Sequence, residues 1–127
     1  MTSAGSSRGS VTLEIAILGP VLLLVVFTII QVGLWSYARS LALAAAQEGV
    51  AAGRAYGAPN NAGGASAERF LAERAGDSLL DPEVRSSRRG GDLVVRVTGR
   101  SLSVLPGVPG LGVAQSAQAP FEEFTTP

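Results

Sequence analysis

The sequence EIAILGPVLLLVVFTIIQVGLWSY, residues 14–37, decides the fold. From residue 15 to residue 38 no side chain is charged, and the only clearly polar ones are Thr28, Gln31 and Ser36. As a helix rising about 1.5 Å per residue, this run spans the roughly 30 Å of bilayer hydrocarbon with some tilt. Its aliphatic residues each favour insertion by roughly 0.3 to 0.6 kcal/mol. The remaining chain is too small to bury such a helix on every side, so the run is predicted to span a membrane.

Composition limits what the rest of the chain can do. The 127 residues leave room for a short leader and one small domain beside the span. The net charge is zero, which argues against nucleic acid as a partner. With neither Cys nor His, the chain has no disulfide, no cysteine nucleophile and no zinc site built on these residues. It also contains no Gly-x-Ser-x-Gly elbow and no nucleotide-binding fingerprint. We therefore expect no enzymatic activity, no cofactor and no small-molecule substrate.

The segment before the span, residues 1–10, is small and polar, which predicts a flexible cytoplasmic leader. A cleaved secretory signal has an apolar core of about 7 to 15 residues followed closely by small residues. Here the apolar run is longer, and Ala42 and Ala44 follow it only after several positions. A signal anchor that stays in the membrane fits better. The positive charges on the two sides of the span, Arg8 before it and Arg39 after it, are nearly equal in number. The positive-inside rule therefore favours only slightly an amino terminus on the cytoplasmic side.

A third interpretation comes from the spacing of Gly9 and Glu14 immediately before the apolar run. A basic residue, a Gly, four further residues and a Glu resemble the processing site of class III (type IV-like) prepilins, which a membrane-embedded peptidase cuts after the Gly. The resemblance implies a leader of residues 1–9, a cut between Gly9 and Ser10, and a new α-amine at Ser10. An unpaired charge next to hydrocarbon costs several kcal/mol, so pairing of this amine with Glu14 between subunits would satisfy both. The alternative is a Gly-Ser linker followed by an interfacial Glu.

The pattern continues beyond this site. The chain has GSVTLEIAILGP at 9–20, then a Leu/Val run, QVG at 31–33 and AAAQEGVAAGR at 44–54. Over roughly the first half of the chain this resembles the TadE-like family, pseudopilins of the tight-adherence (Flp) pilus assembly system. The resemblance implies a minor pilin in the cytoplasmic membrane with its C-terminal domain outside the cytoplasm. The implied partners are membrane lipid, the prepilin peptidase, other pilins or pseudopilins, and the pilus assembly platform.

The alternative function is a signal-anchored envelope protein, unrelated to pili, whose small outer domain binds a ligand or a wall component. The two functions predict different mature proteins, because only a pseudopilin loses the leader before Ser10.

Several residues of the run have candidate roles. Gly19 and Pro20 predict a kink, because Pro20 cannot donate to the helical ladder. The kink either is merely tolerated or shapes packing against other pilin helices. Gln31 either bonds a partner helix or lies near the outer headgroups. Trp35 and Tyr37 suit the membrane interface.

After the span, the helix is expected to continue to Arg54, since Ala is the best helix former. Small residues recur there every four positions in two stripes, namely Ala38, Ala42 and Ala46, and Ala45, Gly49 and Gly53. Such stripes let another backbone approach closely. An Ala-rich composition without structural meaning is the alternative.

The remainder, residues 55–127, is predicted to form a small extracytoplasmic domain. A loop from Tyr56 to Ala65 leads to a helix capped by Ser66, which ends near Leu80 at Asp81-Pro82. Strands are expected over 83–88, 93–100 and 113–119, with a turn at 89–92 and with Leu93, Val95 and Val97 on one side of the second strand. The acidic row Glu73, Asp77 and Asp81 is interpreted as a solvated face rather than a metal site. The basic residues Arg85, Arg88 and Arg89 have no aromatic residue among them on which nucleic-acid bases could stack, so nucleic-acid binding is not expected. The predicted fold class is an α+β membrane protein: a leader (1–9), a long N-terminal transmembrane helix with its extension (10–54), and one short helix with a few antiparallel strands.

Overall fold

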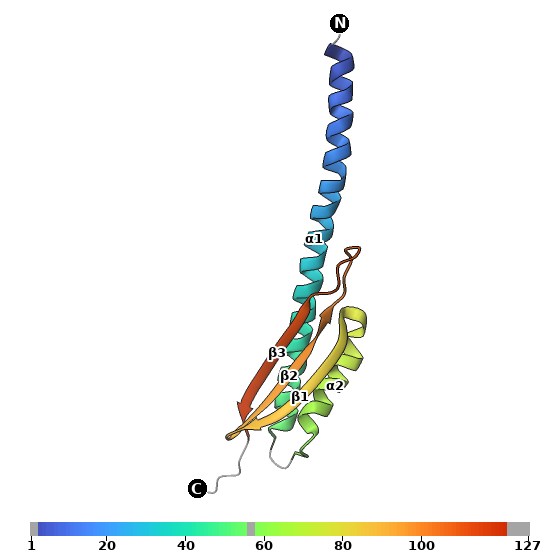
Figure 1. The fold of residues 1–127 in the computed structure, drawn as a ribbon. Helices are drawn as coiled ribbons and strands as arrows, with labels where there is room; N and C mark the ends of the chain where they lie inside the picture. Colours follow the sequence, from blue (N-terminus) through green and yellow to red (C-terminus); the bar gives the residue numbers. More distant parts are fainter. Residues whose placement is uncertain (1–2, 56–57, 122–127) are drawn as a thin grey trace.

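The computed structural model describes residues 3–55 and 58–121, and side chains from residue 9 onward. Figure 1 shows a long helix that carries a small domain on its C-terminal half. In chain order the elements are α1 (Ser3–Gly53), α2 (Ala62–Arg74), the short 3-10 helix η1 (Gly76–Ser78), β1 (Leu79–Arg89), β2 (Asp92–Ser101) and β3 (Gly112–Pro120). The strands form one antiparallel sheet in the order β1-β2-β3. The predicted α+β fold with one long N-terminal helix is confirmed.

The helix α1 begins earlier than expected. Its first residue is Ser3, inside the segment that the sequence predicted to be a flexible leader, so that prediction is wrong for the backbone of residues 3–10. Adding residues to a helix that is already nucleated costs little, and this segment contains no Pro. The small polar composition of the segment therefore does not prevent it from extending the apolar helix.

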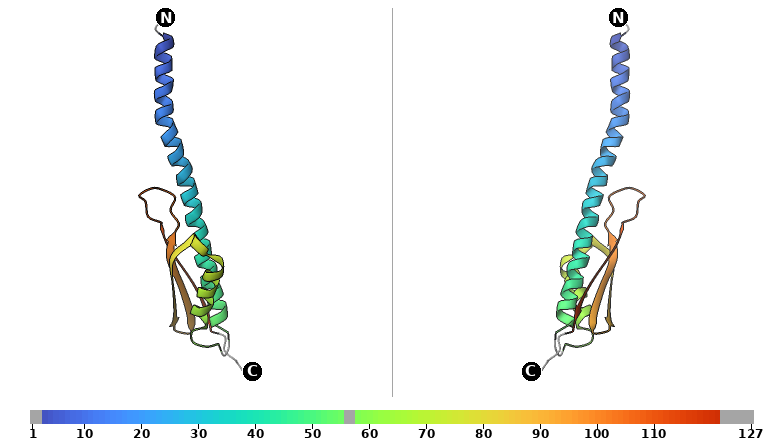
Figure 2. Two further views of the ribbon diagram at one scale, coloured as in Figure 1. Left: turned by 90° about the vertical axis from the view of Figure 1, so that its right-hand side faces the viewer. Right: turned by 90° about the vertical axis from the view of Figure 1, so that its left-hand side faces the viewer.

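The domain has two layers. Both helices cover the same face of the sheet, as the side views in Figure 2 show. The predicted inward row of β2 is confirmed, because Leu93, Val95 and Val97 are 4%, 0% and 0% exposed. From α1, the buried residues that join this core are Ala38, Leu41, Ala42, Ala45, Ala46 and Val50. The domain core thus consists of one sheet face and the Ala-rich extension of α1.

The stripes of small residues have a structural purpose. An added Cβ at Gly49 would lie 2.7 Å from the carbonyl oxygen of Gly63 in α2, and one at Gly53 would lie 2.9 Å from the Gly63 Cα. Such distances leave no room for a methyl group. For the stripe of Ala45, Gly49 and Gly53, the interpretation that small residues allow close packing of backbones is confirmed at the two glycines, and the partner is α2 of the same chain.

The boundaries of α2 and β1 correct the prediction for residues 56–82. The helix begins at Ala62, not at Ser66, and ends at Arg74 rather than near Leu80. Gly76, with φ of +51°, begins the short η1, and β1 follows directly. Its first residue, Leu79, is 2% exposed and pairs with Ser101. Burial of Leu79 by this pairing outweighs the helical pattern that continued through it.

Asp81-Pro82 lies inside β1 instead of ending a helix. The register between β1 and β2 shifts between Leu80 and Glu83, and Asp81 has a φ of 50°. Pro82 cannot donate to the ladder, a defect that an edge strand with a bulge tolerates. The other strand predictions hold: β1 and β2 flank the turn at Gly90-Gly91, and β3 covers the expected third strand.

Candidate membrane span and processing site

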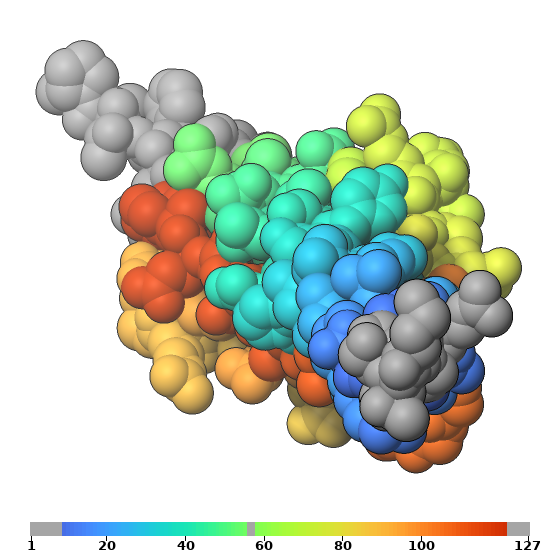
Figure 3. Space-filling view, turned by 90° about the horizontal axis from the view of Figure 1, so that it is seen from above, coloured from blue at the N-terminus to red at the C-terminus, as the bar shows by residue number. Residues whose placement is uncertain are grey.

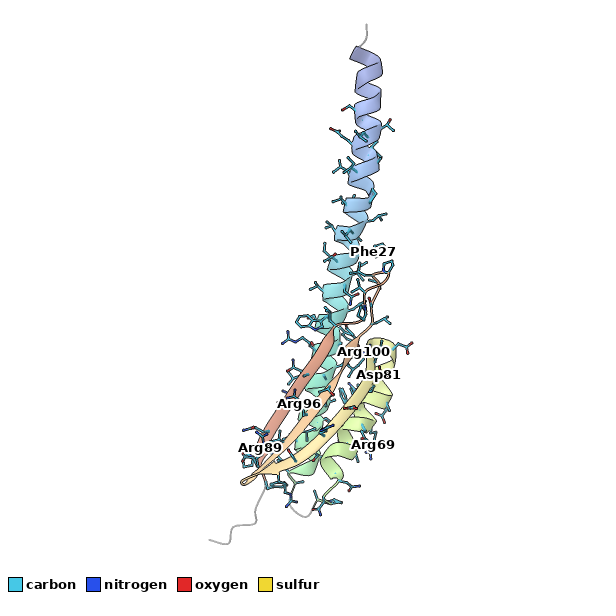
Figure 4. All side chains as sticks on the ribbon, in the orientation of Figure 1. Phe27, Arg69, Asp81, Arg89, Arg96 and Arg100 are labelled. Atoms are coloured by element: carbon cyan, nitrogen blue, oxygen red, sulfur yellow. The ribbon has the colours of Figure 1, made fainter. Side chains whose placement is uncertain are left out.

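The N-terminal half of α1 projects from the domain and is apolar on all sides. Figure 3, viewed from above, shows its blue part standing in front of the domain, and Figure 4 shows its side chains pointing away from the helix in all directions. Large apolar side chains are exposed from Val11 to Ile30, among them Leu22 at 65% and Ile29 at 66%. A helix over 11–30 is about 30 Å long, the thickness of bilayer hydrocarbon. Within the described residues, α1 is the one helix that is long and apolar enough to cross a membrane.

Exposure distinguishes this segment from the core helix of a soluble protein. A core helix of similar hydropathy is covered by the protein around it, whereas the side chains of residues 11–30 are covered by nothing in this chain. An exposed apolar surface of this size needs a lipid or protein environment. The structure therefore supports the predicted membrane span.

The three residues of the predicted processing and pairing site lie at the start of this segment. Gly9, Ser10 and Glu14 belong to α1 and are exposed. Positions 10 and 14 are four residues apart, so they lie on the same face of the helix, one turn from each other. A Cβ at Gly9 would have no atom within 4 Å. In the described part of the chain, nothing outside the helix's own backbone packs against Gly9.

Pro20 lies inside α1 and does not end it. Figure 2 shows that α1 changes direction in its N-terminal half. At Gly19, a Cβ would meet nothing within 4 Å, so the glycine is not required by a neighbour in this chain. The assignment of a kink to Gly19 and Pro20 stays a prediction.

Gln31 has a role that the sequence interpretation missed. Its side chain is 4% exposed, and its Nε2 donates to the carbonyl oxygen of Leu102 at 3.0 Å and to the Ser101 Oγ at 3.4 Å. Its Oε1 accepts from the backbone N–H of Val104 at 2.9 Å. Gln31 therefore holds the connection between β2 and β3, where we had expected a partner helix or headgroups. No local sequence signal links residues so far apart along the chain.

Residues 9–51 match the family described as TadE-like protein. Over this segment the chain is similar to that family. The match confirms the resemblance over these residues. It begins at Gly9 and ends within α1, so α2 and the sheet lie outside it. Comparison with curated proteins and with solved structures gives no match.

The aromatic residues at the end of the TadE-like segment's apolar run face different surroundings. Trp35 donates its Nε1 proton to the carbonyl oxygen of Gly112 at 3.2 Å, and the guanidinium of Arg39 lies 4.7 Å from the centre of its ring. Tyr37 is 52% exposed. Trp35 thus ties α1 to β3, while contact of Trp35 and Tyr37 with the membrane interface stays a prediction.

Charged residues of the domain do not converge on a site in the described part of the chain. There, no three acidic side chains lie close enough to hold a metal ion. Asp81 pairs instead with Arg100. Arg88 donates to the Oδ1 of Asn60 at 3.2 Å and covers the Phe121 ring at 4.4 Å. These contacts stabilise the fold and suggest no chemistry.

Proposed function

We propose that this protein is a pseudopilin, or minor pilin, of a Tad (Flp) pilus or a related secretion machinery, and that its role is structural rather than enzymatic. In this proposal a prepilin peptidase removes residues 1–9, and α1 then packs with the helices of other pilins and with the assembly platform. The observation that carries the proposal is the exposed apolar helix that follows Gly9 and Glu14 directly, within the TadE-like segment.

The position of Glu14 within the proposed span favours pairing of its carboxylate with a cation. If residues 11–30 occupy the hydrocarbon, Glu14 lies about one turn inside its edge. A charged side chain within a span is costly, by roughly 2.5 to 3.5 kcal/mol at the centre for Asp and less near the edge. Cleavage places an α-amine at Ser10, and a helix bundle brings the amine of one subunit near the Glu14 of another. The pair then neutralises both charges as the filament forms.

Substitution of Gly9 tests the cleavage. Because a Cβ at this position has no neighbour within 4 Å, Gly9→Leu leaves the fold intact and changes only what a peptidase meets. In cells that contain the cognate peptidase, we expect the wild-type protein to begin at Ser10 by intact-mass analysis and Gly9→Leu to keep its leader. Gly33→Ala, also without a neighbour within 4 Å, is the matched control and should be processed normally. A wild-type protein that keeps residues before Ser10 would refute the cleavage and favour the signal-anchored envelope protein.

Substitution of Glu14 tests the pairing. Glu14→Gln should still insert into the membrane but recover less of the other pilins in co-purification. Glu48→Gln removes an exposed carboxylate from the domain half of α1 and should leave this recovery unchanged. Equal recovery with both variants would count against a pairing role for Glu14.

The proposed topology places the amino terminus in the cytoplasm and the α2–sheet domain outside the cytoplasmic membrane. Because the chain has no Cys, a single cysteine introduced at the exposed Ser116 of β3 reports on one site. A membrane-impermeant maleimide should label this cysteine in intact spheroplasts. Labelling only after lysis would show the opposite orientation, with the α2–sheet domain in the cytoplasm.

A further inference from the structure

The connection between β2 and β3, residues 102–111, is unusually apolar for an exposed loop, and we call it the β2–β3 loop. No residue from Ser101 to Phe121 is charged. Leu102, Val108 and Leu111 are 38%, 44% and 43% exposed. Exposure of these apolar side chains to water is unfavourable, so their removal from water by a contact would be favourable.

The β2–β3 loop lies where α1 changes from a covered to an uncovered helix. Figures 1 and 4 show it extending past the sheet toward the N-terminal half of α1, to the level of Phe27. Gln31, one residue after the exposed segment 11–30 ends, binds it at Leu102 and Val104. In Figure 2 the tip of the loop points away from α1. Val108 at this tip is 44% exposed.

Several polar groups of the loop have hydrogen-bond partners within the chain. The Ser103 Oγ donates to the carbonyl oxygen of Val108 at 2.6 Å, and the Val108 N–H donates to that of Leu105 at 3.2 Å. The backbone N–H of Leu111 donates to the Ser101 Oγ at 3.2 Å. Irregular backbone exposed to lipid is excluded from the hydrocarbon itself, so a membrane contact of this loop would lie at the boundary with the headgroups.

We propose that the β2–β3 loop is a second membrane contact, in which Val108 and its apolar neighbours enter the boundary between headgroups and acyl chains where α1 leaves the bilayer. This inference rests on the proposed insertion of residues 11–30. Lipid is the occupant because the loop is continuous with the surface of the span: a bilayer that covers α1 up to Ile30 reaches the level of the loop. Gln31 is the positioning residue, and its burial keeps its amide away from lipid. The two contacts together fix the tilt of the domain on the membrane.

Single-cysteine labelling tests the proposal in the full chain, which has no Cys of its own. The variants Val108→Cys, Leu22→Cys and Ser116→Cys place an environment-sensitive fluorophore on the loop, in the span and on the exposed part of β3. The proteins are reconstituted into phosphatidylcholine–phosphatidylglycerol vesicles that carry spin-labelled lipids with the label at a shallow or a deep position. Unchanged emission of Trp35 checks that each variant folds.

We expect shallow-label lipids to quench the fluorophore at 108, deep-label lipids to quench the one at 22, and neither to quench the one at 116. Quenching at 22 without quenching at 108 would overturn the loop contact and leave the span intact. Absence of quenching at 22 would overturn insertion itself, and the loop contact with it. A fluorophore at 108 that is shielded only after other pilins are added would show that a protein, not lipid, covers the loop, and would also overturn the proposal.

Discussion

Two glycines of the same helix should respond in opposite directions to the same substitution. Gly33 and Gly49 both lie inside α1. A Cβ at Gly33 has nothing within 4 Å, whereas at Gly49 it would lie 2.7 Å from the Gly63 carbonyl oxygen and 3.0 Å from the Val95 Cγ1. The first obstacle at Gly49 is backbone, which cannot rotate away. To admit a methyl group, α1 and α2 must move apart.

The magnitude follows from two contributions. Replacing Gly by Ala inside a helix gains about 1 kcal/mol in both variants. At Gly49, overpacking subtracts about 1 to 3 kcal/mol, since the core must shift to accept the methyl. The helical gain cancels in the comparison, so Gly49→Ala should be less stable than Gly33→Ala by about 1 to 3 kcal/mol. For a domain of this size, each kcal/mol corresponds to about 4 to 8 °C in the unfolding midpoint.

The assay is thermal unfolding of the full chain in detergent micelles, followed by the fluorescence of the single tryptophan. Trp35 donates to Gly112 in β3, so its emission changes when α1 separates from the sheet. We expect Gly33→Ala to unfold slightly above the wild type and Gly49→Ala clearly below Gly33→Ala. Equal midpoints for the two variants would mean that α1 and α2 do not pack as closely as the structure shows, and would refute the reasoning.

Two further pairs of variants test the sheet. Gly110→Ala should destabilise the β2–β3 connection, because its Cβ would overlap the Ser101 carbonyl oxygen, while Gly112→Ala should be neutral with nothing within 4 Å; hydrogen exchange of the loop amides distinguishes them. Asp81→Asn should change the free energy of unfolding by less than about 1 kcal/mol, because the pair with Arg100 is exposed and Asn tolerates a positive φ. Asp81→Val should cost about 1 to 2 kcal/mol more, since a β-branched residue is strained there, and denaturant unfolding measures both.

The sequence predicted the elements whose pattern is local. The alternation of Leu93, Val95 and Val97 defined β2 and its buried face, and Gly90-Gly91 defined the turn before it. The family match at residues 9–51 likewise rests on a contiguous pattern. Where the periodicity of a segment determines its own secondary structure, contacts with neighbouring segments change that structure little.

The predictions were wrong where contacts with a segment distant in the sequence determine the local structure. Leu79 continues the helical pattern of α2, yet its pairing with Ser101 makes it the first residue of β1. Asp81 and Pro82 are common at helix ends, but a bulge in an edge strand accommodates both. For the candidate site, the sequence predicted the roles of Gly9, Ser10 and Glu14 and the structure places all three on α1, but cleavage and pairing depend on partners that no single chain contains.

Gln31 shows why hydropathy alone misplaces the end of the span. The uncharged run continues from residue 15 to residue 38, but the structure divides it at Gln31. Before this residue the apolar side chains are exposed; after it, Trp35 and Ala38 pack against the domain, while Val32 and Tyr37 are still 54% and 52% exposed. Hydropathy cannot distinguish burial in lipid from burial in protein, because both remove the same surface from water. If the hydrocarbon ends near Ile30, just before the buried Gln31, a span of about 30 Å begins near Val11. Glu14 then lies about one turn inside the hydrocarbon, where the cost of an unpaired carboxylate favours the proposed pairing with a cation on a neighbouring helix.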